Sequence, residues 1–317
     1  MRLLIALAAF ALAPSAALAA DGNSFDGHLS ASAGYNSHTL DDWTQTDPNG
    51  TNSGTDGTKV SGADFEIHGS VSLPIAGSIG AQVDGALTRT NYTVQDCQFC
   101  NKFHSDNSTA ALHLFTRGPK VAFGVFGQRT TQSMSWNESH TLYAAGGEAR
   151  VFAGPVHVSG QFGYVGVESG NYDAKIRGPH VAANLRFFPQ PNLKFELRGS
   201  HTAIKQSPND NSGYNCPDYC YVQKLNNWNF GTTAEYRLPH SGLSFFARVD
   251  VEKGKQRSEY DNAPYFSDYE QKFSRTRAMF GIKFSFGSSS LVESDRSGAG
   301  FDPVQFDEFA LANNNNS

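Results

Sequence analysis

After its first twenty residues the sequence has no apolar run of the length, about 18 residues, that a membrane-spanning helix needs. Methionine is scarce, with 3 residues, whereas Gly 31, Phe 24 and Tyr 12 favour strands and turns over helices. Basic residues are not in excess, because the formal net charge is −5, and this excludes nucleic-acid binders as a class. The mean hydropathy of −0.42 indicates a soluble protein unless apolar and polar residues alternate.

The first twenty residues have the pattern of a secretory signal peptide. Arg2 gives a positive start, an apolar segment follows over residues 3–13, and Ala17, Ala19 and Ala20 form a small-residue cleavage site. We therefore expect residues 1–20 to be removed on export. Loss of Arg2 changes the formal charge from −5 to −6.

Apolar and polar residues alternate with a period of two along most of the remaining chain. In the clearest case, Ala278–Phe286, every even-numbered residue is apolar. Twelve such segments are predicted as strands, over residues 25–37, 60–73, 78–92, 108–116, 120–132, 141–153, 155–169, 174–188, 193–206, 225–238, 243–258 and 272–286. Their apolar faces cover about nine residues each, which is the length of a tilted strand that crosses hydrocarbon. Phe115 and Phe152 are expected in aromatic belts at the membrane interfaces.

Short and long connections alternate between these segments. Short turns fall at 74–77, 117–119, 153–155, 189–192 and 239–242, and longer loops at 38–59, 95–107, 133–140, 170–173, 207–224 and 259–271. A soluble β-sandwich has crossing connections of scattered length. The alternation instead predicts that residues 21–286 form an all-β fold, an antiparallel transmembrane β-barrel of about 12 strands. Short periplasmic turns and longer extracellular loops then place both chain ends in the periplasm.

The segment from Met279 to Phe286, which alternates and ends on an aromatic residue, resembles the terminal strand of Gram-negative outer-membrane proteins. As a pattern, the resemblance to this porin-like superfamily of β-barrels covers residues 25–286. It implies a location in the bacterial outer membrane, contact with outer-membrane lipid and insertion by the barrel assembly machinery. The chain departs from the usual form because 31 residues follow Phe286.

The opposite faces of the strands carry ionisable residues, which we expect to line a lumen from end to end. The early strands supply mainly acids and histidines, and the last four supply most of the Arg and Lys. The candidate lumen residues are Asp26, His28, Asp64, Glu66, Asp84, Arg186, Lys194, Arg198, Arg237, Arg248, Asp250, Arg275, Arg277 and Lys283. Such a lining favours a narrow porin-like channel for passive diffusion of small hydrophilic solutes. A network of ion pairs that fills the barrel is the alternative.

The 4 cysteines form two close pairs, Cys97 with Cys100 and Cys216 with Cys220, each in a predicted long loop. Paired cysteines also occur in four-thiolate zinc sites. An exported chain meets an oxidising compartment, however, so disulfides are favoured, with their connectivity open. No cofactor or metal is implied.

An enzyme is not expected, because the sequence has no G-x-S-x-G elbow. Ser135, Glu138 and His140 lie close together, but in a loop where such residues are ordinary. A lipid hydrolase is the less favoured alternative, since a catalytic triad is recognised by geometry. The other alternative to a channel is a closed structural or adhesion barrel that acts through its surface loops.

Residues 287–317 break the alternation and carry several acidic side chains. The simplest expectation is a disordered, polar and acidic periplasmic tail. The alternative is that Phe301, Phe306 and Phe309, with their acidic neighbours, fold back to the barrel mouth and pair with luminal Arg and Lys.

Overall fold

The computed structural model describes residues 25–47, 50–55, 57–94, 102–134, 139–169, 172–207, 220–261, 268–297 and 300–305. The strands are β1 (Asp26–Asp47), β2 (Gly50–Thr55), β3 (Lys59–Ala76), β4 (Ile79–Val94), β5 (Phe103–Arg117), β6 (Val121–Met134), β7 (Ser139–Ala153), β8 (Val156–Ser169), β9 (Tyr172–Gln190), β10 (Leu193–Ser207), β11 (Cys220–Arg237), β12 (Leu243–Asp261) and β13 (Asp268–Phe286). One short helix, α2 (Leu291–Ser297), follows them. In these ranges, no helix is long and apolar enough to cross a membrane.

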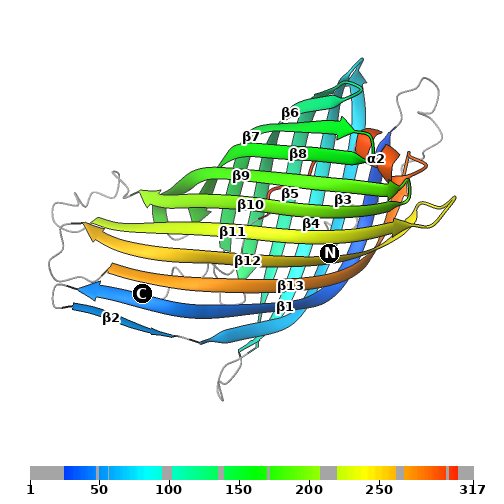
Figure 1. The fold of residues 1–317 in the computed structure, drawn as a ribbon. Helices are drawn as coiled ribbons and strands as arrows, with labels where there is room; N and C mark the ends of the chain where they lie inside the picture. The colour runs from blue at the N-terminus through cyan, green and yellow to red at the C-terminus, as the bar shows by residue number, and fades with distance from the viewer. Residues whose placement is uncertain are drawn as a thin grey trace.

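Twelve of the strands close into an antiparallel barrel, as the sequence predicts (Figure 1). β3 to β13 pair in chain order, β1 pairs with β3, and β13 pairs back to β1. The closing register sets Gly27 opposite Phe286 and Thr39 opposite Ser274. The short turns lie at the same end of the barrel as α2, on the right of Figure 1.

The expectation of a loop over residues 38–59 is wrong for most of that range. β1 continues to Asp47, and β2 folds back on it from Gly50 to Thr55. Polar residues on both faces hide the period-two signal where a strand leaves the hydrocarbon. Backbone pairing nevertheless continues, because β13 and β2 supply hydrogen-bonding partners on the two sides of β1.

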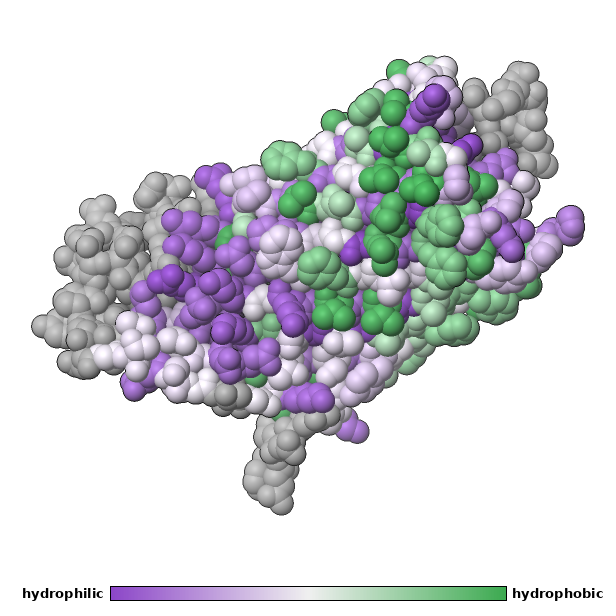
Figure 2. All heavy atoms as spheres, viewed as in Figure 1, coloured by the Kyte–Doolittle hydropathy of each residue, from purple (hydrophilic) through white to green (hydrophobic). Residues whose placement is uncertain are grey.

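The outer surface is apolar only over the half of the barrel nearest α2 (Figure 2). Large apolar side chains are exposed there, among them Phe280 at 62%. Toward the other end the outer surface is polar and carries ion pairs such as Lys255 with Glu270, 3.3 Å apart. An exposed apolar band of this extent is stable only in contact with lipid, so the strands extend beyond the membrane on one side.

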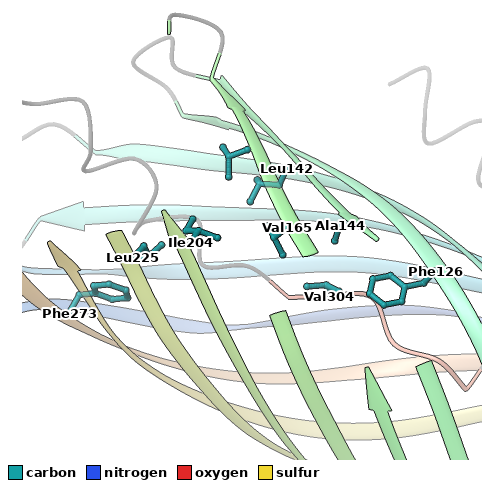
Figure 3. Close-up of a cluster of buried hydrophobic side chains, with 9 residues drawn as sticks. Phe126, Leu142, Ala144, Val165, Ile204, Leu225, Phe273 and Val304 are labelled. Carbon is teal, nitrogen blue, oxygen red and sulfur yellow. The ribbon is translucent and has the colours of Figure 1, made fainter. Parts of the chain in front are cut away.

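The inner face shows the reverse distribution of polarity. Along β13, Arg275 and Arg277 point into the lumen on the side of the apolar band. Phe273 also points into the lumen, but it lies nearer the other end, where the neighbouring Lys272 is exposed on the outer surface. An apolar collar therefore lines the barrel beyond the membrane band (Figure 3). Its buried members include Leu142, Ala144, Val165, Val167, Ile204, Leu225 and Phe273. A lumen ionised from end to end was the wrong expectation, because a strand in water needs an apolar interior.

After β13 the chain turns back into the barrel at Gly287. This residue has a φ of +89°, and a Cβ there would lie 1.9 Å from the carbonyl oxygen of Phe25. Only glycine fits this left-handed conformation and close approach without strain. The turn redirects the chain from the barrel rim to its interior, where residues 300–305 lie.

The helix α2 is capped and then fixed to the barrel mouth. Ser290 Oγ accepts from the backbone N–H of Glu293 at 3.2 Å, as an N-cap does, and the Glu293 carboxylate accepts from the N–H of Ser289 at 2.8 Å, one residue before the cap. The N–H of Leu291 donates to the carbonyl of Pro191 at 2.9 Å. The simplest expectation, a disordered tail, is therefore wrong for residues 287–297 and 300–305. For Phe301 the structure agrees with the fold-back alternative.

Several expectations fall on residues outside the described ranges. These are the signal peptide over residues 1–20, Cys97, Cys100 and Cys216, and the tail residues Phe306 and Phe309. Cys220 begins β11, but its side chain is not among those described. Signal cleavage and loop disulfides stay predictions.

The position of the apolar band can be tested by placing one charge at two depths on β13. Phe280→Arg puts a cation in the middle of the band and should lower the free energy of unfolding in lipid vesicles by about 2–4 kcal/mol. Ser274→Arg lies on the same face beyond the band and should cost about 0–1 kcal/mol. Guanidinium titration of both variants measures the difference, and equal destabilisation would contradict the proposed depth.

Candidate functional site

The tail residue Asp295 is bound by three basic side chains of the inner wall. Its carboxylate accepts from Arg186 at 2.6 Å, from Arg150 at 3.2 Å and pairs with His157 Nδ1 at 2.5 Å. Burial raises the pKa of Asp295, but the positive charges of Arg150 and Arg186 and the contact with His157 outweigh it and hold the pKa below its usual range. The carboxylate is therefore ionised at neutral and mildly acidic pH, and these ion pairs persist there.

Arg186 on β9 also holds the second tail carboxylate. Its guanidinium donates to Asp302 and, at 2.6 Å, to the carbonyl of Gly300, while Glu196 on β10 accepts from its Nε at 2.9 Å. Asn184 donates to Asp302 at 2.7 Å from the same strand. A single buried guanidinium thus binds three points of the tail, Asp295, Gly300 and Asp302, and Glu196 holds the guanidinium in place.

Phe301 occupies an aromatic pocket between these charges. Its ring stacks on His113 with centroids 5.8 Å apart and lies 5.5 Å from the ring of Phe115. The Arg150 guanidinium sits 4.9 Å from the centroid of Phe301, a cation–π arrangement. Phe115 and Phe152 belong to the same buried cluster, so their expected place in interfacial belts is wrong. They face inward and hold the tail.

Two glutamines bind the tail backbone. Gln82 on β4 donates to the carbonyl of Phe301 at 2.7 Å and accepts from its N–H at 3.2 Å. Gln128 on β6 makes the same pair of bonds to Val304, each at 2.7 Å. Neither glutamine was a candidate from sequence, because a neutral amide gives no charge signal; their strand parity, with Gln82 two residues from Asp84, was the available clue.

The opposite wall carries a ladder of ion pairs that does not depend on the tail. Glu66 on β3 pairs with Arg248 on β12 and Arg277 on β13, each at 2.9 Å. Further pairs on this wall are Arg277–Asp64 at 2.5 Å, Arg248–Asp250 at 3.0 Å, Arg198–Asp250 at 2.7 Å, Arg275–Glu252 at 3.6 Å, Lys194–Glu235 at 2.9 Å and Lys283–Glu235. Asp64 and Glu66 of β3 therefore meet bases of the late strands across the closure of the barrel, and the other pairs join acids and bases within β10–β13.

The remaining predicted lumen residues lie nearer the mouth. Asp26 accepts from Ser297 of α2 at 2.8 Å, and Arg237 donates to the carbonyl of Ser288 at 3.2 Å. His28 contacts His68 at 3.3 Å. Asp84 lies 3.2 Å from His113, whose other ring nitrogen contacts Glu148 at 2.9 Å. The structure thus divides the predicted set into a tail-binding wall on β4–β9, an ion-pair wall on β10–β13 and β3, and a mouth that holds α2.

Two polar cavities separate the tail from the ion-pair wall. The larger has a volume of about 190 Å³ and the smaller about 130 Å³. Both are lined by Glu66, His68, Arg198, Arg248 and Asp302, so they adjoin across the same charged side chains. The tail fills one side of the lumen and leaves the charged side hollow.

Similarity to known proteins is found in the fold and not in the sequence. No protein-family model and no curated protein sequence matches the chain. The crystal structure of an outer membrane channel from Pseudomonas putida F1 superposes with a TM-score of 0.51 at 12% identity, covering 86% of this chain and 99% of that one. The chain has the fold of an outer-membrane β-barrel.

Two other barrels show a weaker likeness. The translocator domain of the autotransporter NalP from Neisseria meningitidis matches with a TM-score of 0.43 at 8% identity, covering 89% of this chain and 93% of that one. The KdgM porin matches with a TM-score of 0.37 at 10% identity, covering 80% and 99%. These values establish no closer relationship than the shared barrel.

Loss of the two tail carboxylates should release the tail. In Asp295→Asn/Asp302→Asn the charge-assisted bonds to Arg150 and Arg186 disappear, each of which contributes about 1.5–3 kcal/mol. Trypsin should then cleave after Arg296 about tenfold faster or more in the folded, detergent-solubilised protein. Gln305→Ala, which changes an exposed tail residue, is the control. Equal cleavage rates in all three proteins would contradict tail docking through Asp295 and Asp302.

Proposed function

We propose that the protein is a gated diffusion channel for small hydrophilic solutes in the bacterial outer membrane. The observation that supports this most is the charge-lined hollow of about 190 Å³ between the tail and the ion-pair wall. The Arg and carboxylate side chains along it offer donors and acceptors that can replace the hydration shell of a polar solute. Because the charges are largely paired, neither sign of solute is strongly excluded.

The tail is the movable part of this proposal. Its described residues touch the wall through ion pairs, hydrogen bonds and one aromatic pocket, and Gly287 joins them to β13. A segment held only by such contacts exchanges between docked and released states, and any condition that weakens the contacts shifts the population toward release. We infer that release widens the hollow across the full lumen.

The orientation follows from the distribution of loops. Single-chain bacterial barrels place their short turns in the periplasm. The mouth that holds α2 and the start of β1 would then face the periplasm, and the strand ends beyond the apolar band would face outward. Solutes would meet the apolar collar first and the charged hollow second.

Ion selectivity tests whether the charged hollow is part of the conduction path. Arg275 and Arg277 lie beside Glu252, Asp64 and Glu66, so Arg275→Gln/Arg277→Gln leaves these carboxylates without their cations. Single-channel recording in planar bilayers should show discrete conductance steps in the wild type and a reversal potential shifted toward cations in the variant. Lys255→Gln, at an exposed position on the outer surface, should leave the reversal potential unchanged. No conductance from correctly folded wild type and tail-released protein would instead favour a closed barrel that acts through its loops.

Gating is tested separately with the variant in which the tail is released. Asp295→Asn/Asp302→Asn should have a higher open probability than the wild type, because weakened docking lets the tail leave the lumen. The wild type recorded in the same bilayers is the reference, and heat-modified migration on a gel verifies folding. If conductance and open probability match those of the wild type while trypsin cleavage shows release, the tail is not the gate.

A further inference from the structure

The tail-binding wall recognises peptide backbone. A carboxamide has one acceptor and two donors, and Gln82 and Gln128 each use them to bind both the N–H and the C=O of a single tail residue. Gln161 on β8 adds a bond of 2.7 Å to the carbonyl of Asp302. Five hydrogen bonds to main-chain atoms therefore come from three glutamines on alternate strands of one wall. Such contacts depend on an extended backbone and not on which side chains it carries.

The bound segment has the conformation that this wall requires. Pro303 keeps Asp302 in extended backbone space. The two residues whose N–H and C=O are both bound by one glutamine, Phe301 and Val304, are three apart, which is the repeat of a polyproline II helix. Figure 3 shows Val304 beside Phe126 on the inner face of the wall. An extended peptide with this repeat can present both backbone groups of a residue to the wall at every third position.

Side-chain selectivity comes from two adjacent pockets. The aromatic pocket of His113 and Phe115, closed by the Arg150 guanidinium, accepts Phe301. The cationic pocket of Arg186 and Asn184 accepts the next side chain, Asp302. The pair selects an aromatic residue followed directly by an acidic one.

We propose that this wall is a binding site for short extended peptides that carry an aromatic residue followed by an acidic residue, and that residues 300–305 are its tethered occupant. A free peptide of this kind competes with the tail for the same side chains and shifts the tail toward release. The inference goes beyond the proposed channel, because binding to the wall needs no flow of ions. It can therefore hold or fail independently of conductance.

The test uses the full-length chain with residues 300–305 replaced by alternating Gly and Ser, which removes the anchors of this segment and leaves the wall and Asp295 intact. A fluorescent, end-blocked peptide with the sequence of Gly300–Gln305, GFDPVQ, is titrated into the folded protein in detergent, and binding is followed by anisotropy. Saturable binding is expected, and replacement of the peptide's Phe by Ala or its Asp by Asn should weaken it about tenfold or more. The wild type should bind less tightly, because its tethered tail competes at an effective concentration in the millimolar range.

Wall substitutions separate backbone recognition from simple adhesion to a charged surface. Gln82→Met/Gln128→Met in the same tail-replaced protein keeps side-chain size but removes four hydrogen bonds, and should weaken binding about tenfold or more. Gln45→Met, in β1 at the opposite end of the barrel, should leave binding unchanged. Absence of saturable binding up to about 1 mM peptide, the concentration a short tether imposes, would overturn the proposal. So would binding that Gln82→Met/Gln128→Met leaves intact in a correctly folded barrel.

Discussion

Buried charge inside a narrow barrel has to be neutralised where it lies, and the tail supplies part of that neutralisation. Arg150 and Arg186 are buried on adjoining parts of the tail-binding wall, and among the described residues of the strands a carboxylate hydrogen-bonds to only one of them, Glu196 of β10 to Arg186. An uncompensated guanidinium in such a place costs several kcal/mol. Asp295 and Asp302 remove that cost, so the wall and the tail are parts of one electrostatic unit.

The same requirement explains why the two walls of the lumen behave differently. On β3 and β10–β13 the Arg, Lys, Asp and Glu side chains neutralise one another and need no occupant, which leaves a hollow beside them. On β4–β9 the amides and guanidinium groups are directed at a segment from another part of the chain. Polarity along the barrel axis follows the surroundings in the same way. The ion pairs of the interior lie where lipid covers the outside, and the apolar collar lies where water does.

The lipid environment also decides how much of this could be predicted from the sequence. Alternation is strict where one face of a strand meets lipid, so the twelve strands, their short turns and the inward residues such as Glu66 and Arg277 follow from period two. The signal weakens beyond the band, and the end of β1 with β2 was expected to be a loop for that reason. Phe115 and Phe152 were misplaced because an aromatic residue near a strand end suits an interface and a pocket equally well.

The tail-binding wall was the part that sequence alone could not assemble. Gln82, Gln128 and Gln161 are neutral, lie on separate strands and become one site only through the registers that link β4 to β8. The tail itself has no periodicity that shows which wall it meets. Its acidic residues and Phe301 indicated that the tail could fold back into the barrel. Only the structure shows which residues of the wall it contacts.

The contact between tail and wall is tested most directly by thiol cross-linking. The protein with its 4 native cysteines changed to Ser receives Gln128→Cys and Val304→Cys, at positions whose backbones are held one glutamine side chain apart by two hydrogen bonds of 2.7 Å. Because this separation exceeds the reach of a direct disulfide, a short bifunctional thiol reagent should link the pair in the folded barrel, as mass spectrometry of the linked peptides will show, while Gln45→Cys with Val304→Cys should not be linked. Absence of the cross-link in the first pair, in a correctly folded barrel, would contradict a lumen occupied by residues 300–305.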